Sequence, residues 1–111
     1  MKRGEIYFAN LDPTIGSEIK KKRPVLIVSN DINNKVAATL TVIPLTSNTN
    51  KIYPFEVLFE MQESGLPKRS KAQCHQIRTI SKIRISGTKI GSVSKEIMTR
   101  INVALKLHLD M

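Results

Sequence analysis

The last segment of this 111-residue sequence has the apolar spacing and the length of a helix of several turns. Residues 95–108 contain neither Gly nor Pro, and Ser94 precedes them as a good N-cap. Ile97, Ile101 and Leu105 recur at helical spacing. Upstream, turn-forming residues divide the chain into short apolar stretches. The sequence therefore predicts several short strands followed by one C-terminal helix.

The clearest strand is residues 24–28, a continuous Pro-Val-Leu-Ile-Val run typical of a strand buried on both faces. We expect further strands over 5–9, 38–45, 55–61, 70–76 and 89–93. Residues 14–22 have no apolar period and predict a loop, residues 30–35 are turn-like, and a tight turn is expected near Gly87. Within 55–61 the alternation places Glu56 on the polar side. The expected fold is α+β, mostly β: a small, strongly bent sheet or partly closed barrel of five to seven short strands, capped by the helix.

Length and composition indicate one domain, residues 1–111, because 41% of the residues are hydrophobic and 24% charged. No apolar run approaches the roughly 18–20 residues that cross a bilayer. The first ten residues lack the apolar region of a secretory signal. Cys74 is the single cysteine, so neither an internal disulfide nor a cysteine zinc site is expected, and it is most simply a small core residue. We expect a soluble, cytoplasmic protein.

Positive charge is concentrated in two segments. The chain has 18 Lys and Arg against 9 Asp and Glu, a formal net charge of +9, and a sequence pI near 10.0. One basic run is Lys20 to Arg23, and residues 64–95 hold eight basic side chains and no acidic one. Such a distribution is typical of a nucleic-acid-binding face, and equally of a solvated surface that keeps a small protein soluble.

The sequence lacks the catalytic motifs of most enzyme classes. There is no phosphate-binding loop, no nucleophile elbow and no zinc-ligand spacing. His75 and His108 stand 33 positions apart, and the nine acids are too scattered to hold a metal. A nuclease built from this chain would need no metal or other cofactor, and its substrate would be RNA. The ribose 2′-hydroxyl of RNA can attack the adjacent phosphorus, whereas DNA lacks that group.

Six motifs follow one another in order over nearly the whole sequence. They are Arg3-Gly4-Glu5-Ile6-Tyr7, Asp12-Pro13 with Gly16-Ser17-Glu18, Arg23-Pro24-Val25-Leu26-Ile27-Val28-Ser29, Pro44-Leu45-Thr46-Ser47, Tyr53-Pro54-Phe55-Glu56-Val57, and Ser70 followed by Gln76-Ile77-Arg78-Thr79-Ile80. Together they resemble the MazF/PemK family of toxin endoribonucleases.

The resemblance implies an SH3-like barrel with a C-terminal helix, a homodimer, and the toxin component of a type II toxin–antitoxin system. It implies sequence-specific, metal-independent cleavage of single-stranded RNA, mostly mRNA, leaving a 2′,3′-cyclic phosphate and a 5′-hydroxyl. It also implies a cognate antitoxin that docks over the active site. An acidic antitoxin would suit the charge of +9.

By the same resemblance, Arg23 falls on the family's catalytic arginine and Thr46 on its catalytic threonine. Arg23 would stabilise negative charge on phosphorus, and the Thr46 hydroxyl would hold a phosphate oxygen. Glu18 matches a family acid and would be the base or an anchor of its loop. His75 stands where several relatives carry Asp or Glu, and would be the base or a packed strand histidine. His108 is most simply a favourable helix-end residue.

Basic and polar residues near these positions are the expected RNA contacts. They are Lys20, Lys21, Lys22, Ser47, Lys68, Arg69, Ser70, Gln76 and Arg78. Target specificity should depend on the loops at 15–22 and 47–53.

Two other function classes remain open at this point. Gyrase poisons share the toxin fold, but they depend on a Trp near the C-terminus and this chain has none. A silent RNA-binding or regulatory member is the other class, and the presence of both Arg23 and Thr46 weighs against it.

Overall fold

The computed structural model describes residues 1–12, 15–18 and 22–111. This part of the chain forms a seven-stranded sheet and two α-helices, with three single-turn 3₁₀ helices between strands. In chain order the elements are β1 (Glu5–Asn10), β2 (Lys22–Ile27), α1 (Asp31–Val36), β3 (Thr39–Thr46), β4 (Glu56–Phe59), η1 (Met61–Glu63), β5 (Ser70–Gln73), η2 (Cys74–Gln76), β6 (Arg78–Ser81), η3 (Lys82–Arg84), β7 (Ile85–Ser92) and α2 (Lys95–Leu109). The predicted mostly-β fold with a C-terminal helix is confirmed.

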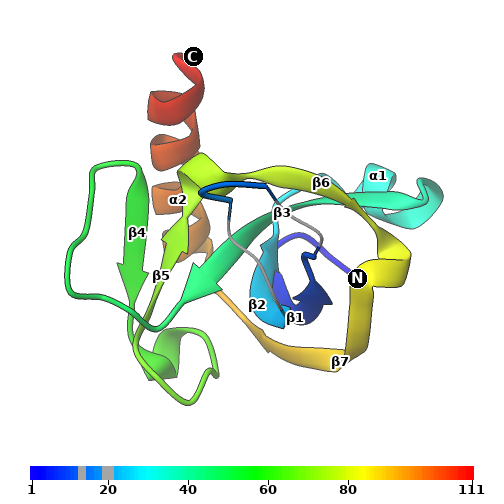
Figure 1. The fold of residues 1–111 in the computed structure, drawn as a ribbon, viewed down its shortest axis with the longest axis horizontal. Helices are drawn as coiled ribbons and strands as arrows, with labels where there is room; N and C mark the ends of the chain where they lie inside the picture. Colours follow the sequence, from blue (N-terminus) through cyan, green and yellow to red (C-terminus); the bar gives the residue numbers. More distant parts are fainter. Residues whose placement is uncertain (13–14, 19–21) are drawn as a thin grey trace.

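The strands lie in the order β4-β5-β3-β2-β1-β7 and all pairs are antiparallel, as Figure 1 shows. The long strand β3 has two partners on one edge: β6 pairs with Thr39–Val42, and β5 pairs with Leu45 and Thr46. Among the described strands, β4 and β7 do not pair with each other. The sheet is therefore bent but open, and a fully closed barrel is not formed.

One glycine brings the two ends of this open sheet together. The Ser92 amide of β7 donates to the Ser64 carbonyl, 3.2 Å away, in the connection between β4 and β5. A Cβ on Gly91 would lie 2.0 Å from that carbonyl oxygen, so no other residue fits there without a backbone shift. This contact fixes where Gly65 and Leu66 sit relative to β7.

The core lies on both faces of the sheet. One cluster, which includes Leu26, Ile43 and Phe59, packs against α2. The other, which includes Val25 and Ile27, covers the opposite face. Neighbouring residues of β2 thus enter different clusters, which confirms the prediction of a strand buried on both faces.

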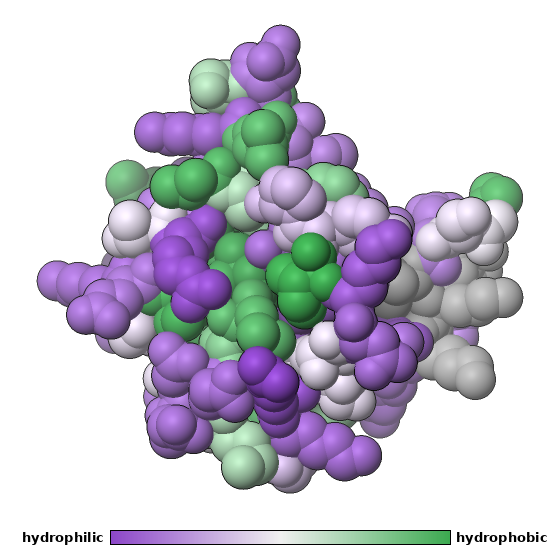
Figure 2. All heavy atoms as spheres, turned by 90° about the vertical axis from the view of Figure 1, so that its left-hand side faces the viewer, coloured by the Kyte–Doolittle hydropathy of each residue, from purple (hydrophilic) through white to green (hydrophobic). Residues whose placement is uncertain are grey.

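Helix α2 begins and ends close to where the sequence predicts. Its N-cap is Ser94, whose hydroxyl accepts from the Ile97 amide at 3.2 Å, and Ile97 and Ile101 are buried. Val103 and Leu107 on its outer side are exposed, and Figure 2 shows hydrophobic atoms among hydrophilic ones on this side of the molecule. No helix among the described residues is long and apolar enough to span a membrane.

The turn expected over 30–35 is instead the short helix α1. Asn30 caps it, because its side-chain oxygen accepts from the Asn33 amide at 2.8 Å. The sequence signals of a turn and of a helix cap are the same residue types, Asn and Asp, and only the cap geometry separates them.

The tight turn expected near Gly87 is also wrong, because β7 continues through it. Ile6 lies opposite Gly91 while Phe8 lies opposite Ser86, so β7 carries extra residues in an irregular pairing that contains Gly87 at φ +77°. A bulge of this kind uses the same glycine freedom as a turn.

The strands expected over 55–61 and 70–76 are shorter than predicted, since each runs into a 3₁₀ turn, η1 or η2. The strand β6 follows η2 and pairs with β3, and it is not among the strands that the sequence pattern predicts.

Candidate active site

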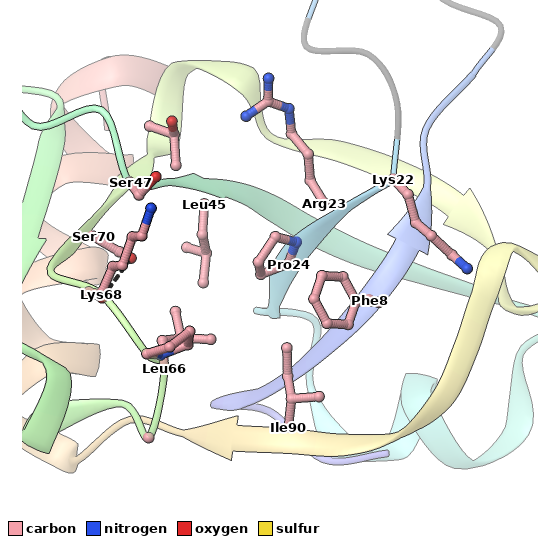
Figure 3. Close-up of a pocket in the computed structure, with 13 residues that line it drawn as sticks. Phe8, Lys22, Arg23, Pro24, Leu45, Ser47, Leu66, Lys68, Ser70 and Ile90 are labelled. Carbon is pink, nitrogen blue, oxygen red and sulfur yellow. Dashed lines mark hydrogen bonds between the residues drawn. The ribbon is translucent and has the colours of Figure 1, made fainter.

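A cavity of about 460 Å³ opens between the edge of β7 and the ends of β2 and β3. Phe8, Pro24, Leu45, Leu66 and Ile90 supply its apolar surface, and the labelled side chains in Figure 3 lie across the middle and lower part of that view. Hydroxyls and cations stand around the rest of it. The described residues that complete the lining are Lys22, Arg23, Thr46, Ser47, Gly65, Pro67, Lys68 and Ser70.

Arg23 enters this cavity from a strand rather than from a loop. Pairing between β1 and β2 extends to Lys22 opposite Asn10, so Arg23 lies opposite Ala9 and is half-buried. The apolar β2 run behind it is what fixes this register, because its side chains are buried on both faces. The guanidinium is a permanent cation with several donors, suited to phosphate oxygens.

Thr46 is the last residue of β3 and is also half-buried. Val25 pairs with Pro44, and continuing that antiparallel register by two residues brings Arg23 level with Thr46. The Thr46 hydroxyl oxygen accepts from the Asn48 amide at 3.2 Å. A hydroxyl that accepts one bond still has its own proton to donate, so Thr46 can donate to a bound ligand.

The electrostatic character of the cavity is cationic. Lys22, Arg23 and Lys68 line it, and the lining residues that the structure describes include no carboxylate. Ser70 donates its hydroxyl proton to the Lys68 carbonyl at 3.0 Å, which ties the two expected RNA contacts to one segment. Lys20 and Lys21 lie outside the described residues. An anion is the ligand that such a cavity favours.

Glu18 does not line the cavity. It is exposed, its carboxylate accepts from the Ile15 amide at 2.7 Å, and its own amide donates to the Ile15 carbonyl at 3.3 Å. In this structure Glu18 closes a local turn within residues 15–18.

His75 lies in η2, away from the lining residues. Its ring packs edge-on to Phe55, with centroids 4.5 Å apart, and lies 6.5 Å from the His108 ring. Burial lowers the pKa of His75 below its usual range, and the charges of His108 and Lys71 lower it further, while Glu56 acts in the opposite direction. The Nδ1 atom is buried and has no hydrogen-bond partner among the described residues. These surroundings favour the neutral form of the imidazole, which packs against His108 of the C-terminal helix.

The three remaining expected RNA contacts also lie outside the lining. Arg69 forms an exposed ion pair with Glu60, at 3.0 Å. Gln76 belongs to η2 beside His75. Arg78 donates to the Leu11 carbonyl at 3.3 Å, so its guanidinium holds the chain where β1 ends.

Two predictions about other groups bear on the site. Cys74 is buried, and burial raises the pKa of its thiol to about 12, as expected of a core cysteine rather than a nucleophile. No group of three or more His, Cys, Asp or Glu in the described part of the chain could hold a metal ion.

The apolar half of the cavity was missed by sequence reasoning. Phe8, Leu66 and Ile90 come from segments far apart in the chain, and each resembles an ordinary core residue in its own segment. The sequence carries no local signal for these residues, because the 39% exposure of Phe8, between half-buried Tyr7 and buried Ala9, is visible only in the structure.

Comparison with known proteins gives a consistent result. A family model described as a PemK-like, MazF-like toxin of a type II toxin–antitoxin system matches residues 2–109. Endoribonuclease MazF9 of Mycobacterium tuberculosis is 46% identical, covering 100% of this chain and 98% of that protein. Endoribonuclease EndoA of Bacillus subtilis is 37% identical, covering 100% and 96%.

Solved structures agree with the sequence relatives. An endoribonuclease in complex with its cognate antitoxin from a Mycobacterial species superposes with a TM-score of 0.81 at 27% identity, covering 100% of this chain and 96% of the other. MazF from Deinococcus radiodurans has a TM-score of 0.86 at 22% identity, over 100% and 97%, and shows likeness of fold.

Proposed function

Because this chain belongs to the PemK-like, MazF-like toxin family of type II toxin–antitoxin systems, we propose that it is the endoribonuclease of such a system. Its substrate is single-stranded RNA, chiefly mRNA, which it cuts at specific sequences without a metal. The observation that carries this proposal is the placement of Arg23 and Thr46 on adjacent strands at one cationic cavity.

The chemistry follows from what the cavity offers a phosphodiester. The 2′-oxygen attacks phosphorus while the bond from phosphorus to the 5′-oxygen breaks, leaving a 2′,3′-cyclic phosphate and a 5′-hydroxyl. A base takes the 2′-proton, and the departing 5′-oxygen takes up a proton. Arg23 stabilises the charge that builds on the non-bridging oxygens, and Thr46 donates to one of them. Lys22, Ser47 and Lys68 bind the flanking backbone.

Glu18 and His75 are the two candidates for the base that takes the 2′-proton. Both are outside the cavity lining of a single chain, since Glu18 bonds to Ile15 and His75 packs on Phe55. We therefore assign the transition-state contacts to Arg23 and Thr46, and the pH dependence of cleavage by a His75 variant decides whether His75 is the base.

The partners we propose are a second copy of this chain and an acidic cognate antitoxin. A structural relative was solved in complex with its cognate antitoxin, and the charge of +9 favours an acidic segment at the cationic cavity. The exposed hydrophobic side chains of α2 favour coverage by another chain. The cytoplasm, where mRNA is found, is the location that this function requires.

The test is to incubate the protein with a defined single-stranded RNA in EDTA and to map both new ends. We expect a 2′,3′-cyclic phosphate and a 5′-hydroxyl at a fixed sequence. Replacing only the ribose before the scissile phosphate with deoxyribose should abolish the cut. Cleavage of that substrate, loss of activity in EDTA, or no RNA cleavage at all would overturn the proposal.

A further inference from the structure

A buried ion pair joins β4 and β5 beside the cavity. The Lys71 ammonium of β5 is 3.0 Å from the Glu56 carboxylate of β4, and their side chains are only 10% and 2% exposed. Glu56 was expected on the polar side of its strand, and its burial is a correction that Lys71 explains. Neither residue lines the cavity, yet Lys71 is the direct pairing partner of Thr46 across β3 and β5.

The pair is bonded to the loop that follows Thr46, residues 47–55. Lys71 donates to the Lys51 carbonyl at 2.7 Å, and the Glu56 oxygen that it contacts also accepts from the Tyr53 amide at 3.0 Å. Figure 1 shows this loop as the wide connection between β3 and β4. Two side chains thus hold two backbone groups in the second half of the loop.

The first half of the same loop is bonded to the candidate catalytic residue. The Asn48 amide donates to the Thr46 hydroxyl at 3.2 Å, and the Asn50 amide donates to the Asn48 side chain at 3.4 Å. A path of hydrogen bonds therefore runs along the loop from Thr46 towards the buried pair. Movement of the second half of the loop would therefore change the orientation of the Thr46 hydroxyl.

Stability alone gives no reason to bury these charges. The cost of desolvating two charges generally matches or exceeds their attraction, and apolar residues of similar size often serve stability as well. This buried pair also binds the Lys51 carbonyl and the Tyr53 amide, so its contribution is to fix the position of the loop.

We propose that Lys71, through its pair with Glu56, is a positioning residue that fixes residues 47–55 and so orients Thr46 and Ser47 toward RNA. This inference rests on the proposed function. Lys71 contacts no reacting atom, and its effect on cleavage passes through the loop.

The test is the double variant Lys71→Met/Glu56→Leu, which removes both charges and leaves the net charge unchanged. The matched control is Lys89→Met/Glu5→Gln, which removes a pair at 3.5 Å on β7 and β1 whose side chains are 50% and 18% exposed. Three quantities are measured in each: the midpoint of thermal unfolding, amide hydrogen exchange at Asn48 and Asn50, and single-turnover cleavage with the cut sites mapped.

We expect the Lys71→Met/Glu56→Leu protein to unfold near the wild-type temperature while its Asn48 and Asn50 amides exchange faster. Its cleavage rate should fall by about 10- to 100-fold, the scale for a misplaced site group, with relaxed choice of cut site. The control should match wild type in all three. Neither substituted residue bonds to these two amides, so their exchange reports on transmission along the loop.

Unchanged exchange at both amides would overturn the positioning role, and so would faster exchange with wild-type rate and cut sites. A wild-type protein that cuts no RNA would instead overturn the proposed function. In that case the exchange data still decide whether the pair holds the loop.

Discussion

Arg23 and Thr46 meet at the cavity because they lie on neighbouring strands just beyond the last β2–β3 pair, Val25 and Pro44, and each offers one contact to the transition state. We expect Arg23→Ala and Thr46→Val each to slow single-turnover RNA cleavage by about a hundredfold or more, the scale for losing one preorganised donor. Both side chains are only half-buried, so circular dichroism should show folded proteins with little change in thermal midpoint.

Two variants serve as controls for that experiment. Thr46→Ser keeps the hydroxyl and should retain most activity, while Lys35→Ala removes an exposed cation of α1, outside the cavity. If Arg23→Ala cuts RNA at the wild-type rate, the assignment of the site to this cavity is wrong.

His75 has a testable acid-base signature in stability. Because burial lowers its pKa in the folded protein, the unfolded chain, with a pKa near 6.5, binds the proton more readily. The free energy of unfolding should therefore decrease as pH falls below about 6.5, down through the pKa of the folded state. Urea titrations of wild type and His75→Gln at pH 7.5 and 5.5 should show a smaller decrease in the variant.

The same residue is tested for catalysis by the pH–rate profile. His75 packs on Phe55 and His108 rather than lining the cavity, so we expect His75→Gln to cut RNA within a few-fold of wild type. A large loss of rate, together with loss of a titration near neutral pH, would identify His75 as the general base instead.

At the scale of elements, the contact between β7 and the β4–β5 connection shapes the cavity. Gly91→Ala would place a Cβ 2.0 Å from the Ser64 carbonyl oxygen, so β7 and the β4–β5 connection would have to move apart. That connection also contains the lining residues Gly65 and Leu66. We expect a loss of about 1–3 kcal/mol in the free energy of unfolding, as for other overpacked sites, together with slower cleavage.

Urea denaturation measures that loss, with Ser92→Ala as the neighbouring control. Ser92 is exposed, and its replacement should change stability by less than about 0.5 kcal/mol. Equal stability of Gly91→Ala and wild type would show that the close approach of these two segments is not required.

At the scale of the whole molecule, we predict a homodimer. A chain of 111 residues buries a modest share of its surface alone, and Val103 and Leu107 of α2 are 65% and 57% exposed. Sedimentation equilibrium should give twice the chain mass at micromolar concentration. A single species of 12.5 kDa at that concentration would contradict the prediction.

Local pattern was sufficient wherever a segment's own residues determine its environment. The spacing of Ile97 and Ile101 predicted α2, and the β-branched run predicted β2 as a strand buried on both faces. Local pattern failed where two kinds of local structure use the same residue types. Asn30 caps a helix instead of opening a turn, and Gly87 serves a bulge instead of ending a strand.

The sequence by itself determined the mostly-β class, the terminal helix and, through its motifs, the positions of Arg23 and Thr46 as candidates. Only the tertiary structure decided that these two residues share a cavity with Phe8 and Ile90, and that Glu18 and His75 lie outside its lining. It also decided that Glu56 is buried, because the partner that permits this, Lys71, is 15 positions away on another strand. Periodicity records which way a side chain points from its own segment. What it meets there depends on pairing between distant segments, and that pairing builds the site.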